Sequence, residues 1–121
     1  MAEHGIYEEI RVELERAREL HGNQDHLPGV DQALLSREGG CTAGRMAEEY
    51  EIPSATRAKF LCDYAARWGE CTWAHILVEE LSEAIEAATE GDTENLRTEL
   101  VQVGAMVVGW IESLDSNLGG K

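Results

Sequence analysis

The sequence predicts an all-α protein, a helical bundle built around an antiparallel helical hairpin. Three observations favour this fold class. Apolar residues recur at helical spacing in successive segments of the chain. Glycine and capping residues separate those segments. The stretch 100–111 is apolar nearly all round with one polar side chain, Gln102, as expected of a helix buried on several sides. With 121 residues and no interdomain linker, we expect a single domain over 1–121.

The first half of the chain combines one long helix with a loop-rich stretch. Residues 6–21 carry apolar side chains at helical spacing, and Gly22 ends the predicted helix. Residues 22–40 contain Pro28 and several glycines and are expected to form a long functional or mobile loop. A short helix is predicted over 42–51, interrupted before Pro53.

The second half is expected to hold three helices in close succession. The first runs from about Ser54 to Trp68, where Gly69 closes it, and Thr72 caps the next at 73–89. The segment 90–93 is a tight break in which Gly91 takes the left-handed conformation. Asp92 or Thr93 then caps the last helix, predicted over 93–114.

Acidic side chains of the last two helices meet at one height. Glu80 and Glu83 share a face of the first helix, and Glu99 and Gln102 share a face of the second. In a hairpin centred on the 90–93 break, residue 83 faces about residue 100. At roughly 1.5 Å rise per residue, the four positions lie within about one helical turn. Grouped carboxylate oxygens are the ligands that Mg²⁺ prefers.

An acidic pair three residues apart also arises by chance in a chain with 24 acidic residues. Glu83 and Glu86 fit the same spacing, and any such pair taken alone is more often a solvated helix face. Glu112 and Asp115 fit the spacing too. They project opposite the apolar side of the last helix and lie too far along it to face Glu80 and Glu83. That apolar side consists of Leu96, Leu100, Val103, Val107, Trp110 and Leu114. We therefore interpret Glu112 and Asp115 as solvated.

The segments that carry this pattern resemble a known family. Residues 72–84 and 96–103, supported by 58–66, 15–18 and 21–28, are similar to the MazG-like branch of the all-α NTP pyrophosphohydrolases of the actinobacterial and actinophage type. The hallmark of that superfamily is Glu-x-x-Glu, a gap, and then Glu-x-x-Asp. The likeness covers most of the chain and is weakest over 30–52.

The resemblance implies a four-helix-bundle-like domain, dimeric or larger, that cleaves a nucleoside triphosphate to a monophosphate and pyrophosphate. It implies Mg²⁺, for which Mn²⁺ can substitute, and it gives Glu80, Glu83 and Glu99 catalytic roles as metal ligands. Gln102 occupies the place of the family's Asp. An amide oxygen can coordinate the ion but brings no negative charge and cannot act as a base.

Substrate contacts are assigned among the few remaining polar candidates. Lys59 and Arg57 are two of only ten basic residues, and a phosphate chain needs cationic partners. Gln24, Asp25 and His26 can reach a base or phosphate from the early loop, and Trp73 can stack on a base. Each has a competing structural interpretation: solvated helix residues for the two cations, turn residues for the loop, and core packing for the tryptophan.

Charge and cysteine content exclude several classes of protein. A net charge of −14 repels nucleic acids, whose binding needs a basic patch. No apolar run reaches membrane-spanning length, and the acidic N-terminus does not resemble a signal peptide, so a cytoplasmic location without membrane contact is expected. Cys41, Cys62 and Cys71 have no paired metal spacing and are expected to be reduced, and we expect no zinc site.

Three functions remain open. The leading one is a magnesium-dependent hydrolase acting on a nucleoside triphosphate. The second is a protein that binds or sequesters a nucleotide without turnover, which the amide of Gln102 makes plausible. The third is a purely structural helical interaction module. In each case, the apolar circumference of 100–111 predicts a homodimer or homotetramer that buries part of this helix.

Overall fold

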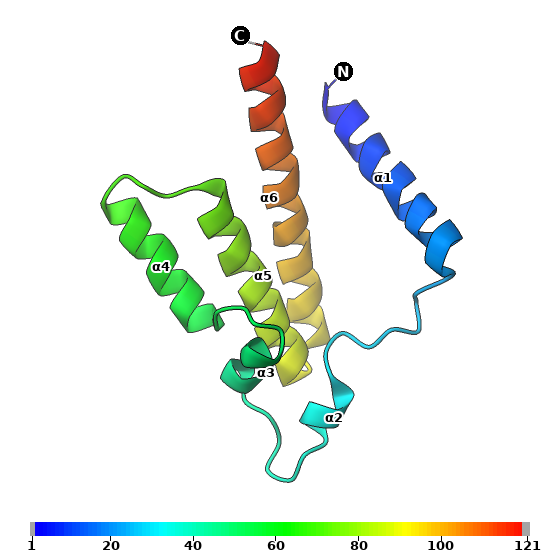
Figure 1. Ribbon diagram of the computed structural model, residues 1–121, viewed down its shortest axis with the longest axis vertical. Coiled ribbons are helices and arrows are strands. Elements are labelled where there is room, and N and C mark those ends of the chain that lie inside the picture. Colours follow the sequence, from blue (N-terminus) through cyan, green and yellow to red (C-terminus); the bar gives the residue numbers. More distant parts are fainter. Residues whose placement is uncertain (1, 120–121) are drawn as a thin grey trace. The chain divides into compact units, whose positions relative to one another are not determined.

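The computed structural model describes the backbone of residues 2–119 and the side chains of residues 5–117 (Figure 1). The described chain is helical without strands, which confirms the all-α class. Residues 1, 120 and 121 of the predicted domain lie outside the described residues. The helices are α1 (Ala2–His21), α2 (Gln32–Leu35), α3 (Ala43–Glu49), α4 (Ala55–Arg67), α5 (Trp73–Glu90) and α6 (Thr93–Gly119). Within the described range, no helix is both long and apolar enough to cross a membrane.

The chain forms two compact units. The first comprises α1 and the residues after it up to Leu27, together with α6 from Val107 onward. Its best-buried described side chain is Ile6, which is 1% exposed. The second unit is Pro28–Met106 and contains all four predicted metal ligands.

Side-chain caps begin the helices of the second unit. Thr42, Ser54 and Thr72 precede α3, α4 and α5, and each accepts a backbone N–H from the first turn at 3.1 to 3.2 Å. These bonds satisfy donors that a helix start leaves free. The three helices therefore begin within one residue of the predicted positions.

Two helix boundaries lie several residues from their predicted positions, and one helix was not predicted. Helix α1 begins at Ala2 rather than residue 6, and α6 continues to Gly119 rather than ending at 114. Helix α2 lies inside the stretch expected to be a loop. It forms because Asp31 accepts the N–H groups of Ala33 and Leu34, at 2.9 and 3.2 Å. The turn also buries Leu34, which is 5% exposed.

The core of the second unit lies where α2 and α3 meet α5. Val30, Leu34 and Met46 are buried, and Ile85 and Ala88 of α5 pack against them. The Asp31 N–H donates to the Tyr50 hydroxyl at 2.8 Å, which ties α2 to the end of α3. The residues predicted to form a mobile loop thus contribute to the core.

Small side chains allow α4 to pack closely on α5. The buried residues of α4 are small and spaced at helical intervals: Ala55, Ala58, Cys62 and Ala65. Ala58 lines a cavity together with His75 and Val78 of α5, so this face of α4 meets α5. This contact holds α4 beside the face of α5 that carries the acidic residues.

A tight turn folds the first part of α6, up to Met106, back along α5 within the second unit (Figure 1). Gly91 has φ 74°, the left-handed conformation predicted for it, and closes α5. Asp92 begins α6, because its carboxylate accepts the Asn95 N–H at 3.0 Å. The predicted hairpin is therefore present for the residues of the second unit, up to Met106, and its turn sets the register of the two helices there.

Candidate metal centre

Three carboxylates converge between α5 and α6. Glu80 and Glu83 lie one turn apart on α5, and Glu99 lies near the start of α6. One oxygen from each carboxylate is within 4.8 Å of the other two. All three side chains are half-buried. The structure therefore brings together the three acidic residues that the hairpin register predicted.

Two of these carboxylates have buried oxygen atoms without a partner. Glu80 Oε2 and Glu99 Oε2 are shielded from solvent, and neither receives a hydrogen bond from the described protein atoms. A buried carboxylate oxygen left unpaired is costly, and a proton or a cation relieves that cost. The helices thus hold acidic oxygens where they require a positively charged ligand or a proton.

The electrostatics of the cluster favour the neutral form. Burial raises the pKa of Glu83 to about 7, and a hydrogen bond to Glu99 adds to the shift. The charge of Glu80 contributes as well. Burial also raises the pKa of Glu80, with a further contribution from the charge of Glu99. Near neutral pH the cluster therefore exchanges a proton, and a cation competes with that proton.

The donor set fits a hard divalent cation. Carboxylate oxygens at about 2.1 Å from Mg²⁺ lie up to about 4.2 Å apart when they occupy opposite positions. The three oxygens lie within 4.8 Å of one another, so their separations are on the scale of a shared cation site. Glu80, Glu83 and Glu99 are the residues that would hold the ion.

Gln102 differs from the three carboxylates in its exposure to solvent. It follows Glu99 by one turn of α6, but its side chain is exposed rather than half-buried. Its role as a fourth ligand stays a prediction.

A polar cavity of about 320 Å³ adjoins the cluster. Glu83 and Glu99 form part of its wall, so the cavity opens directly beside the acidic oxygens. Helices α4, α5 and α6 all contribute to it: the lining residues are Ala55, Thr56, Lys59, Glu83, Glu86, Asn95 and Glu99. The packing of α4 on α5 thus brings a lysine to the metal side of the hairpin.

Lys59 is the predicted substrate contact that the structure brings to this cavity. Its ammonium lies 3.3 Å from the Asp63 carboxylate, one turn further along α4. The hydrogen bond to Asp63 raises the pKa of Lys59, and the charges of Glu79 and Glu83 add to that shift. Lys59 is therefore a cation held among carboxylates at the edge of the site.

Two other predicted contacts lie away from the cavity wall. Arg57 is exposed on α4, and its guanidinium sits 5.4 Å from the centre of the Phe60 ring. This cation–π contact occupies one face of the group. Trp73 is half-buried at the first position of α5. It precedes Glu80 by seven residues, which is roughly 10 Å along the helix axis.

The early-loop residues Gln24, Asp25 and His26 belong to the first unit. All three are exposed, and the Asp25 N–H donates to the Asn23 side chain at 3.0 Å within a turn. That local bond matches their interpretation as turn residues. Their contact with substrate stays a prediction.

Sequence reasoning missed three polar members of the cavity wall: Thr56, Glu86 and Asn95. Asn95 lies four residues before Glu99 and Glu86 three residues after Glu83, so helical spacing from each candidate ligand places them on the same face. Thr56 follows the cap of α4, and only the packing of α4 on α5 brings it to the cavity.

Comparison of the chain with protein-family models, curated proteins and solved structures gives no match.

Proposed function

We propose that this protein is a magnesium-dependent nucleoside triphosphate pyrophosphohydrolase of the MazG-like kind, which converts an NTP or dNTP to a monophosphate and pyrophosphate. The observation that carries the proposal is the convergence of Glu80, Glu83 and Glu99 beside a polar cavity that contains Lys59. The unpaired buried oxygens of Glu80 and Glu99 support a cation at this place. The resemblance of the acidic segments to MazG-like sequences supplies the reaction.

Each residue of the site has a role that follows from its position. Glu80, Glu83 and Glu99 would hold Mg²⁺ or Mn²⁺, and the cation would compete with the proton that Glu83 binds near neutral pH. Once bound, the ion would neutralise charge on the phosphate chain. Lys59 offers a second positive charge to phosphate oxygens at the cavity wall. The cavity orients the chain of phosphates between the lysine and the acidic cluster.

The environment of Gln102 favours a second candidate, a protein that binds or sequesters a nucleotide without turnover. Gln102 is neutral and exposed, whereas the three carboxylates are half-buried. A site with one charge fewer than the family pattern binds a divalent cation less tightly. This candidate differs from the first in turnover and shares its ligand.

The proposal includes the setting in which the protein acts. We infer a cytoplasmic homodimer or homotetramer with a nucleotide as its ligand. The net charge of −14 supports a small ligand that carries its own metal ion over a nucleic-acid polymer.

A nucleotide panel tests the proposal directly. We expect wild-type protein to release pyrophosphate from at least one NTP or dNTP in the presence of Mg²⁺, and Glu80→Gln to abolish that release. Removing one of three anionic ligands should weaken Mg²⁺ binding by at least about 10-fold. The matched control is Glu94→Gln, an exposed acidic residue in the first turn of α6.

The outcomes separate the three functions. Wild-type turnover in Glu80→Gln would contradict the assignment of the metal centre. Nucleotide binding without pyrophosphate release would favour the sequestering protein. If the protein binds neither nucleotide nor Mg²⁺, the helices form a structural interaction module.

A further inference from the structure

Two cysteine thiols lie next to each other where α4 meets the start of α5. The sulfur atoms of Cys62 and Cys71 are 3.8 Å apart. Cys62 is 9% exposed within α4, whereas Cys71 is exposed in the short segment that leads into α5. Cys41 lies against the Val30, Leu34 and Met46 core. Among the described cysteines, Cys62 and Cys71 thus form a pair of one accessible and one buried thiol.

We propose that Cys62 and Cys71 form a redox-active dithiol that closes to an intramolecular disulfide on exposure to a low-molecular-weight disulfide such as oxidised glutathione. The sulfur atoms must approach by roughly 1.8 Å to reach the bond length of about 2.0 Å. Cys71 lies in an interhelical segment that already turns at Gly69, with φ 70°. Cys71 lies outside both helices, directly before the α5 cap Thr72, so the movement falls mainly on this segment.

The reaction follows from the difference in access. The Cys71 thiolate attacks one sulfur of the small disulfide, forms a mixed disulfide and releases one small thiolate. Cys62 then attacks the Cys71 sulfur, its proton passes to solvent, and the second small thiolate leaves. Two protein thiols are oxidised to one disulfide, and one small disulfide is reduced to two thiols. Atoms and electrons balance without a metal or a further oxidant.

The same asymmetry makes the disulfide slow to open. A reductant reaches Cys71 more easily than Cys62, because Cys62 is buried. Attack at Cys71 must expel Cys62, and burial raises the pKa of the Cys62 thiol to about 12. A thiol with a high pKa is a poor leaving group. The same high pKa leaves little Cys62 thiolate near neutral pH, so we expect the disulfide to form slowly as well as to reopen slowly.

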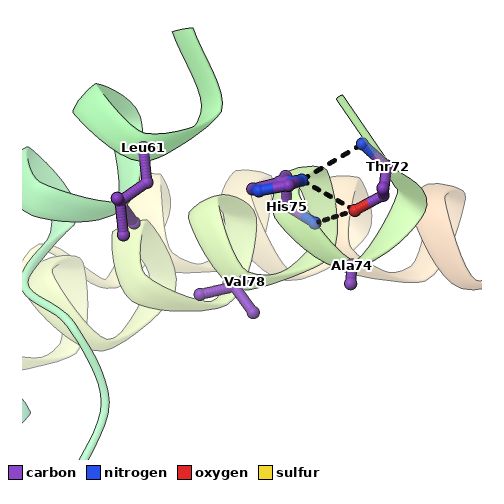
Figure 2. A pocket seen from close by; sticks show the side chains of 6 residues that line it. Leu61, Thr72, Ala74, His75 and Val78 are labelled. Atoms are coloured by element: carbon purple, nitrogen blue, oxygen red, sulfur yellow. Dashed lines mark hydrogen bonds between the residues drawn. The ribbon is translucent and has the colours of Figure 1, made fainter. Parts of the chain in front are cut away.

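The disulfide would cross-link the two helices at one end of a second, apolar cavity. This cavity of about 200 Å³ lies between α4 and α5 (Figure 2). Leu61, which precedes Cys62, and Thr72, which follows Cys71, both line it. Figure 2 shows Leu61 reaching from α4 toward α5, where His75 Nδ1 lies 2.7 Å from the Thr72 hydroxyl. Oxidation would therefore join the two walls of the cavity through adjacent residues and limit its opening.

Thiol counting on the full-length protein tests the proposal. After incubation with oxidised glutathione, we expect the three thiols per chain to fall to one, with a Cys62–Cys71 linked peptide after digestion. The Cys41→Ser variant, which leaves the pair intact, should lose both remaining thiols. The Cys71→Ser variant changes an exposed residue and should not form the linked peptide.

Thermal unfolding supplies an independent measurement. Oxidised wild-type protein should melt at a higher temperature than reduced protein, because the disulfide constrains the unfolded chain. The melting temperature of Cys71→Ser should not respond to the oxidant. A glutathione adduct that persists on Cys71, a bond to Cys41 or disulfide-linked dimers on a non-reducing gel would each overturn the proposal.

Discussion

The carboxylates of the acidic cluster repel one another in the absence of a cation. Glu80, Glu83 and Glu99 are half-buried, and their oxygens lie within 4.8 Å. Burial raises the pKa values of Glu80 and Glu83, and the like charges of the neighbouring carboxylates add to the shift. Without a cation, these carboxylates therefore favour binding a proton or a metal ion.

Glu83 should make the stability of the metal-free protein depend on pH. Its folded-state pKa of about 7 lies above the usual 4.5, so the native state holds a proton that the unfolded chain releases between these values. This contribution to stability is complete below pH 4.5 and is lost as pH rises through about 7. We expect Glu83→Gln, which stays neutral, to melt higher than wild type at about pH 8 and close to wild type at about pH 4. Thermal unfolding in a chelator measures the difference.

Added Mg²⁺ provides the control for this prediction. The ion should raise the melting temperature of wild type at about pH 8 and have a smaller effect on Glu83→Gln, because binding to the native state stabilises it. A gap between the two proteins that does not change with pH would contradict the role of Glu83.

Gln102 offers a test of charge at the fourth ligand position. If the protein is a hydrolase limited by metal affinity, Gln102→Asp should lower the Mg²⁺ concentration for half-maximal rate. A carboxylate adds a full charge where the amide offers a dipole, and a shift of about 10-fold is expected for an added ligand. Pyrophosphate release over a Mg²⁺ titration measures it, with Gln102→Asn as the control that keeps the amide. An unchanged requirement in Gln102→Asp would place this residue outside the metal centre.

At the scale of elements, the α5–α6 turn sets the register that aligns the carboxylates. Gly91 adopts φ 74°, and a Cβ at this position would meet nothing within 4 Å. The requirement for glycine is therefore conformational rather than steric. A side chain here would strain the backbone at the point that holds Glu83 opposite Glu99.

A matched pair of glycine substitutions tests this interpretation. Gly91→Ala should lower the free energy of unfolding by about 1 kcal/mol, because alanine disfavours the left-handed conformation. Gly104→Ala, inside α6 with open space around its Cβ position, should raise it by roughly 0.5–1 kcal/mol through helix propensity. Denaturant unfolding of both variants measures the two effects. If both substitutions changed the free energy of unfolding in the same direction, the turn would not require the left-handed conformation at Gly91.

At the scale of the whole molecule, apolar side chains on the hairpin remain accessible. Leu81 on α5 is 39% exposed, and Leu100 and Val101 on α6 are 51% and 58% exposed. These residues belong to the second unit, whose described core lies toward α2 and α3. The predicted apolar stripes are thus only partly covered within that unit, which agrees with the proposal of a homo-oligomer.

A charge on this face should separate the subunits. We expect wild-type protein to be dimeric or tetrameric at micromolar concentration and Val101→Lys to shift it toward monomer, because an interface excludes an unpaired charge. Light scattering coupled to size exclusion measures the mass. Glu90→Lys, an exposed position at the end of α5, serves as the control. A monomeric wild type would refute the proposed assembly.

The sequence by itself predicted five of the six helices and the cluster of acidic side chains, because these depend on local rules. Capping by Ser54 and Thr72, the left-handed turn at Gly91 and the three-residue spacing of Glu80 and Glu83 all follow from short-range geometry. One turn of known length then aligned Glu99 with that pair. The same local patterns did not predict α2, since a four-residue helix between glycine-rich turns has no periodicity to detect.

Only the tertiary structure decided which other groups surround the ligands. The packing of α4 on α5 through small side chains brought Lys59 and Thr56 to the acidic cavity, and it paired Cys62 with Cys71. The sequence alone predicted three reduced cysteines without paired metal spacing and did not show that two of them are neighbours. Contacts between separate helices depend on how their faces pack, and a helical pattern records the face but not the neighbour that covers it.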